Sequence, residues 1–70
     1  MERKDIESTM IRSIGFESDS STLEVEFKSG VVWQYYDFPE SSWYEFDGSE
    51  SKGKFFLREI RGQYSESQVS

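Results

Sequence analysis

Residues 22–28 (TLEVEFK) alternate without a fault between polar and apolar side chains. Because successive side chains of a strand point to opposite faces, this pattern predicts a strand with one buried face and one face in water. Leu23, Val25 and Phe27 would lie on the buried face. Such a strand is typical of an antiparallel sheet that is covered on one side only.

Flanking segments extend this sheet on both sides. Residues 10–17 include the inward candidates Ile14 and Phe16, and residues 31–37 are rich in the aromatic and β-branched side chains that favour strands. Pro39 should end the last strand, because proline has no N–H for the ladder and restricts the residue before it. We therefore predict three antiparallel strands, over about 10–17, 22–28 and 31–37.

The turn between the second and third strands leaves two registers open. A two-residue turn would pair Phe27 with Val32, and a three-residue loop ending at Gly30 would pair Phe27 with Val31. Only the longer loop places Trp33, and the tyrosine two residues after it, on the core face. We favour this loop because its last position adopts a left-handed conformation that suits glycine, and because it keeps a glutamine out of the core.

Helical spacing begins after Pro39. Residues 39–46 predict a short helix, and residues 52–61 predict a second helix on which Phe56 and Ile60 would face the sheet. The expected architecture is α+β, with both helices packed on one face of the three-stranded sheet. Residues 1–8 and 65–70 are polar and lack a hydrophobic period, so we expect flexible tails around a single domain over 10–64.

Composition argues against several classes of function. The sequence has no histidine and no cysteine, which removes the commonest general base and the imidazole and thiolate ligands of metal sites. With no nucleophile placed beside a base, we expect neither enzymatic activity nor a cofactor. No segment approaches the ~20 apolar residues of a membrane span, and no signal peptide precedes the domain. We therefore expect a cytoplasmic protein without a membrane partner.

Charge is distributed unevenly along the chain. The net charge of −6 disfavours non-specific binding to polyanions. Residues 52–61, however, carry four cations against one carboxylate: Lys52, Lys54, Arg58 and Arg61. The last three are spaced to share one stripe of a helix, where they could contact phosphates, although a solvated helix face would look the same.

Aromatic side chains supply the candidates for stacking on a base. Trp33 and Tyr35 would form a stacking platform on an open sheet, or belong to the core in the favoured register. Tyr36 would then be the outward aromatic residue, as a candidate for stacking or as an ordinary surface tyrosine.

Several short motifs, taken in order, carry a family resemblance. The aromatic centre Trp33-Gln34-Tyr35 is followed by Pro39, and Gly53 precedes Phe56 in the helical segment. This set is similar to the KTSC domain, which forms the C-terminus of some lysyl-tRNA synthetases and also occurs as a small free-standing bacterial protein. The resemblance implies structural roles for Trp33, Tyr35, Pro39, Gly53 and Phe56. Trp33 replaces the usual first tyrosine, and Leu57 stands where asparagine is expected.

The resemblance also implies a partner, either structured RNA or an RNA–protein complex. We accordingly hypothesise a non-enzymatic binding module that contacts phosphates through the four cations of residues 52–61. The alternative is a protein-interaction module with no role in nucleic-acid binding. The acidic face of residues 22–28 and the overall negative charge favour this alternative.

Overall fold

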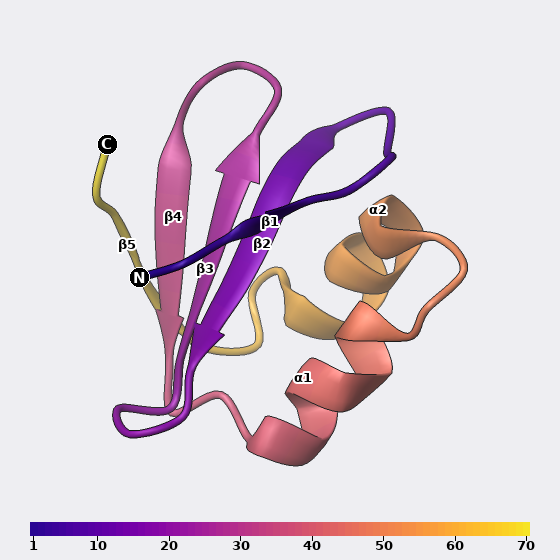
Figure 1. Ribbon diagram of the computed structural model, residues 1–70. Coiled ribbons are helices and arrows are strands. Elements are labelled where there is room, and N and C mark those ends of the chain that lie inside the picture. Colours follow the sequence, from indigo (N-terminus) through magenta and orange to yellow (C-terminus); the bar gives the residue numbers. More distant parts are fainter.

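Five antiparallel strands form one sheet in the order β1-β2-β3-β4-β5 in the computed structural model, which describes residues 1–70 (Figure 1). The strands are β1 Lys4–Asp5, β2 Ile11–Glu17, β3 Thr22–Phe27, β4 Val32–Tyr36 and β5 Ser65–Gln68. The α+β class and the three central strands are confirmed. The prediction of a sheet with only three strands is wrong.

The two additional strands lie at the edges of the sheet, in segments where we had expected flexible tails. Lys4 lies opposite Ile14 in the β1–β2 ladder, and Ser65 lies opposite Tyr36 in the β4–β5 ladder. All residues of β1 and β5 are exposed. An edge strand of this kind is held by main-chain hydrogen bonds to its neighbour and buries little side-chain surface. The sequence of such a strand therefore need not alternate between apolar and polar residues, which is why β1 and β5 were not predicted.

The β3–β4 hairpin has the favoured register. The N–H of Phe27 donates to the carbonyl of Val31 over 2.9 Å, and Val25 lies opposite Trp33. Gly30 closes the three-residue loop with a φ of +99°, a conformation that side chains with a Cβ rarely adopt. Trp33 and the following Tyr35 consequently lie on the core face of the sheet, as predicted.

The helical region is made of three pieces. They are α1 Glu40–Asp47, α2 Lys52–Phe55 and the π-helical turn η1 Phe56–Ile60. Pro39 precedes the first residue of α1, and the Ser51 hydroxyl accepts a hydrogen bond from the N–H of Lys54 at the start of α2. The two predicted helical segments are confirmed, but the second is not a continuous α-helix. The N–H of Arg61 donates to the carbonyl of Phe56 in the wider π pattern, and the backbone of Arg61 is extended.

All helices cover the same face of the sheet, and the core lies between these two layers (Figure 1). The core consists of nine buried residues: Ile11, Ile14, Leu23, Val25, Tyr35, Phe38, Phe46, Phe56 and Ile60. Ring contacts join the layers, since Phe56 meets Tyr35 edge-on with centroids 5.6 Å apart. Trp43 of α1 stacks on Phe16 of β2 at 5.6 Å.

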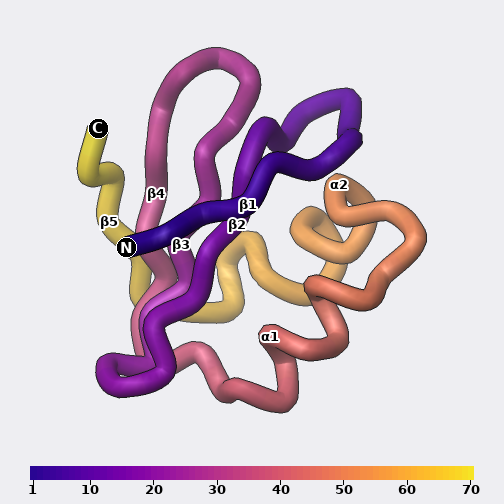
Figure 2. Tube along the Cα trace, in the orientation of Figure 1, coloured from indigo at the N-terminus to yellow at the C-terminus, as the bar shows by residue number.

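The N-terminal residues cross the other face of the sheet, as the indigo segment in Figure 2 shows. The guanidinium of Arg3 forms an ion pair with Glu24 and donates to the Ser13 hydroxyl over 2.9 Å. These contacts bury Glu24, whose exposed fraction is only 6%. The face that the sequence assigned to water is therefore partly covered by the chain itself. No helix of the structure has the length and apolar character that crossing a membrane requires.

Candidate functional site

Basic side chains fall into two groups according to their partners. Four of the eight form ion pairs with carboxylates: Arg3, Lys4, Arg12 and Arg58. Four form none: Lys28, Lys52, Lys54 and Arg61. Three of this second group belong to residues 52–61. The predicted basic segment thus holds most of the positive charge that the fold does not neutralise.

Within this segment the four candidate residues differ in their surroundings. The ammonium group of Lys52 donates to the carbonyl of Ser49 over 2.9 Å and so ties down the loop between α1 and α2. Arg58 is exposed and pairs with the adjacent Glu59 at 3.0 Å. Lys54 and Arg61 are exposed, and their side chains form neither hydrogen bonds nor ion pairs. These two are the cations most available to an external anion.

The expected single stripe of cations depended on a continuous α-helix and is not what the fold provides. The π turn changes the angular spacing after Phe56, and Arg61 lies beyond the last helical residue. Lys54 and Arg61 instead line two neighbouring hollows on the helical side of the molecule. Met10 and Leu57 line both hollows and therefore mark their shared border.

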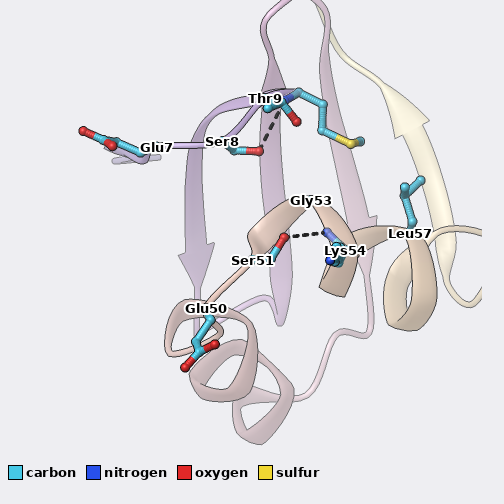
Figure 3. A pocket seen from close by; sticks show the side chains of 9 residues that line it. Glu7, Ser8, Thr9, Glu50, Ser51, Gly53, Lys54 and Leu57 are labelled. Atoms are coloured by element: carbon cyan, nitrogen blue, oxygen red, sulfur yellow. Dashed lines mark hydrogen bonds between the residues drawn. The ribbon is translucent and has the colours of Figure 1, made fainter.

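The first hollow, here called the polar hollow, has a volume of about 400 Å³. It lies between the loop before β2 and the start of α2, where Figure 3 shows Ser8 and Thr9 opposite Gly53. A Cβ at Gly53 would lie 3.4 Å from the Ser8 hydroxyl and from Met10, which is ordinary van der Waals contact. Two carboxylates and one cation line the hollow: Glu7, Glu50 and Lys54.

The second hollow, here called the aromatic hollow, has a volume of about 290 Å³. Six apolar residues line it: Met10, Phe27, Trp33, Tyr35, Phe56 and Leu57. Its two charged residues are Arg61, just after η1, and Glu66 of β5. Burial raises the pKa of the Tyr35 phenol, and the nearby carboxylate of Glu66 raises that pKa further. The hollow thus combines apolar rings with one cation and one hydrogen-bond acceptor.

Tyr36, the candidate stacking residue, lies on the opposite face of the sheet. Its hydroxyl donates to the side-chain oxygen of Gln34 over 3.1 Å, and the Gln34 amide donates to Glu24 over 2.8 Å. This network continues to Arg3. The fold therefore does not bring Tyr36 together with the cations of residues 52–61.

The residues of the family motif occupy structural positions. Tyr35 and Phe56 belong to the core, Pro39 precedes α1, and Gly53 lies in α2 beside Ser8 and Met10. Trp33 is only half-buried, because one side packs on the core while another lines the aromatic hollow.

Four residues of the aromatic hollow were not site candidates in the sequence analysis: Met10, Phe27, Leu57 and Glu66. Glu66 reaches the hollow because it pairs with Tyr35 across the β4–β5 ladder, and the polar sequence of β5 carries no strand signal. Leu57 offered a weak sequence signal, since it is an apolar side chain directly after the inward-facing Phe56. In the structure it is 45% exposed.

Comparison with known proteins gives a consistent result. The KTSC domain model matches residues 7–64. A crystal structure of a KTSC domain protein from Yersinia pestis superposes with a TM-score of 0.93 at 33% identity, covering 99% of this chain and 97% of that one. An uncharacterized protein of Stutzerimonas stutzeri is 30% identical over 91% of this chain and 90% of its own length.

Longer relatives contain a similar segment. Lysine–tRNA ligases of Trichormus variabilis and Nostoc punctiforme are 36% and 34% identical over 64 residues, which is 91% of this chain. The chain spans only 11% of the length of these ligases. On the match over residues 7–64 and the agreement in structure, the chain belongs to the KTSC domain family.

Proposed function

We propose that this domain is a non-enzymatic module that binds RNA through the cations of residues 52–61. The observation that carries the proposal is the availability of Lys54 and Arg61, which are exposed and have no carboxylate partner. Arg58 shares its charge with a neighbouring exposed glutamate, and such a surface pair contributes little and exchanges easily. All three guanidinium and ammonium groups can therefore reorganise around phosphates.

Two of the relatives support RNA as the ligand. Their name, lysine–tRNA ligase, denotes an enzyme that acts on tRNA, and this chain matches a segment of them. The proposed contribution of such a segment is additional affinity for RNA, supplied by phosphate contacts. We place the domain in the cytoplasm, a reducing compartment that suits a chain without cysteine.

A non-catalytic role agrees with the side chains that the domain offers. There is no histidine or cysteine to act as base or nucleophile. Burial and Glu66 both raise the pKa of the Tyr35 phenol, which moves its titration still further from neutral pH. Groups of this kind can position a ligand but have little capacity to exchange protons with it.

The net charge of the chain predicts how strongly the domain should bind RNA. A chain with a net charge of −6 repels RNA at long range, so binding should be weak and should require low or moderate salt. This repulsion gives selectivity, because only RNA that reaches the basic segment gains attraction.

The test is fluorescence anisotropy with a labelled single-stranded RNA of mixed sequence, at about 50 mM salt. We expect the triple variant Lys54→Gln/Arg58→Gln/Arg61→Gln to remain folded, since exposed ion pairs contribute only about 0–1 kcal/mol. Each phosphate contact on a single strand adds about 0.7 to the slope of log affinity against log salt concentration. With 1 M salt as the reference, losing one such contact therefore lowers the affinity at this salt by about eightfold. Circular dichroism would confirm that the variant is folded.

A matched control is available on the opposite face. Arg12 is exposed and lies 3.9 Å from Glu26, so Arg12→Gln removes one positive charge, as each substitution of the triple variant does, without touching the basic segment. Its RNA affinity should stay within about twofold of the wild type. If Arg12→Gln lost one third of the binding free energy that the triple variant loses, net charge, and not this segment, would govern binding.

The second candidate function is docking to a protein. It is favoured by Leu57, an apolar side chain that is 45% exposed at the border of the two hollows. A wild-type domain that binds no RNA at low salt would refute the RNA proposal. Leu57 would then be the first residue to replace in a search for a protein partner.

A further inference from the structure

Trp33 differs from every other aromatic residue of the chain. Nine of the twelve aromatic rings pair with another ring inside the fold. Two of the remaining three, Tyr36 and Tyr44, donate hydrogen bonds through their hydroxyls. Only Trp33 has neither a ring partner nor a hydrogen bond for its indole N–H, although it is half-buried. Trp33 packs against the core and also lines the aromatic hollow, where a ligand ring could stack on it.

The position of Trp33 adds to this observation. It lies on the core face of β4, opposite Val25 on one side and Gln68 on the other. Phe27 and Phe56, which meet edge-on at 5.2 Å, line the aromatic hollow beside it. The ring therefore borders an apolar space of about 290 Å³, close to the lower limit for sites that bind small molecules.

The two charged residues of the hollow define what can occupy it. Arg61 and Glu66 line the same space without forming an ion pair with each other. Arg61 offers an unpaired guanidinium to an anion, and it would repel a cationic ligand. Glu66 accepts hydrogen bonds only, so its partner must carry an N–H or O–H. A flat ring, an anionic group and a hydrogen-bond donor occur together in a nucleotide.

We infer that the aromatic hollow binds one unpaired nucleobase of an RNA strand, with the base stacked on Trp33, its phosphate on Arg61 and its amino group on Glu66. This inference rests on the proposed RNA-binding function and specifies the part of RNA that is recognised. Stacking on an aromatic side chain requires a base that is out of the double helix. Lys54 lies beyond Leu57 in the adjoining polar hollow, where it is placed to meet a neighbouring phosphate.

The carboxylate of Glu66 also predicts a base preference. Cytosine and uracil have similar rings, but cytosine presents an amino group at the position where uracil presents a carbonyl oxygen. A carboxylate accepts from the amino group and repels the carbonyl. We therefore expect oligocytidine to bind about tenfold more tightly than oligouridine of the same length, within the range that one such pairing provides.

The experiment uses Trp33 as its own reporter. Trp43 is the only other tryptophan and stacks on Phe16, outside the hollow, so Trp43→Phe preserves a ring there and leaves Trp33 as the single emitter. Oligocytidine should quench the emission of this variant, and oligocytidine annealed to oligoguanosine should not. The same titration of the wild-type chain, with Trp43 as constant background, gives an independent reading.

Two further variants separate the roles of Arg61 and Glu66. Both side chains are exposed, so replacing them should not disturb the packing of the core. Glu66→Gln should reduce the preference for oligocytidine to about twofold or less, because an amide both donates and accepts. Arg61→Gln should weaken binding while leaving the quenching at saturation unchanged.

Anisotropy of the labelled oligonucleotides distinguishes the two ways in which the inference can fail. If oligocytidine binds while Trp33 emission stays constant, or if duplex and single strand bind equally, the hollow is not a base site and the proposed function stands. If no RNA binds at low salt, the proposed function is refuted and the base site with it.

Discussion

Tyr35 belongs to both the core and the candidate site. Its ring contacts Phe56 in the core, and it also lines the aromatic hollow. It is 3% exposed, and its phenol lies near the carboxylate of Glu66. Burial disfavours the charged phenolate, and the carboxylate repels it, so both effects raise the pKa of Tyr35. Ionisation of this one side chain is therefore opposed by folding.

A dependence of stability on alkaline pH follows. Below about pH 10 the phenol is protonated in both states, and above it the unfolded chain loses this proton while the folded chain keeps it. The folded state then holds more protons than the unfolded state, and the free energy of unfolding falls by up to about 1.4 kcal/mol per pH unit. Urea unfolding of the wild type and of Tyr35→Phe at pH values either side of 10 measures the effect. The variant should lose this fall, and parallel curves would contradict the assignment.

Gly30 provides a second test at the scale of one residue. Its φ of +99° closes the loop that fixes the β3–β4 register, and a Cβ there would contact nothing within 4 Å. Any cost of Gly30→Ala is therefore a backbone cost, which we expect to be about 1–2 kcal/mol. Ser29→Ala in the same loop is the control and should change the free energy of unfolding by less than about 0.5 kcal/mol. Equal stability of the two variants would show that the loop is not held in this conformation.

At the scale of elements, the N-terminal segment and the sheet depend on each other. A Cβ at Gly15 of β2 would lie 2.3 Å from the carbonyl oxygen of Glu2. Arg3, the next residue, binds Ser13 and Glu24 on the same face. Glycine in the middle of this strand is thus explained by the chain that crosses it, and not by a turn.

A double-mutant cycle tests this dependence. Gly15→Ala should destabilise the full chain by about 1–3 kcal/mol, because the added methyl group must displace the crossing segment. In a chain that lacks residues 1–3 the same substitution should cost almost nothing, so the two changes are not additive. Additive effects in thermal unfolding would show that the segment does not lie over Gly15 in solution.

The sequence predicted the central strands correctly but did not predict the edge strands or the π turn, and the reasons are physical. The alternation of residues 22–28 and the glycine at the end of the next loop predicted β3 and its pairing with β4, because burial of one face leaves a period of two. β1 and β5 are short, polar edge strands that leave no such period. The turn of π-helix after Phe56 was also unpredicted, since its residues follow ordinary helical composition.

The candidate site, too, could be predicted from the sequence only in part. Lys54 and Arg61 were found from composition alone, because four cations in ten residues stand out in an acidic chain. The aromatic hollow was not, since it is assembled from β4, β5 and η1 and depends on Glu66 lying opposite Tyr35. Tyr36 was proposed for stacking because it faces outward, but the cations lie beyond the opposite face of the sheet.

At the scale of the whole molecule, the two faces of the sheet differ in how their cations are paired. The outer face of the sheet carries the network of Arg3, Glu24 and Glu26, in which opposite charges neutralise one another. The helical side carries Lys54 and Arg61 without ion-pair partners, beside the half-buried ring of Trp33. RNA is therefore expected to approach one side only, through a small number of phosphate contacts.

The salt dependence of RNA binding measures that number most directly. We compare the slope of log affinity against log salt concentration for the wild type, for Lys54→Gln/Arg61→Gln and for the control Arg12→Gln. The double variant should have a slope shallower by about 1.4, since each phosphate contact on a single strand contributes about 0.7. The slope of Arg12→Gln should match the wild type. An unchanged slope in the double variant, or the absence of RNA binding at low salt, would contradict the proposed function.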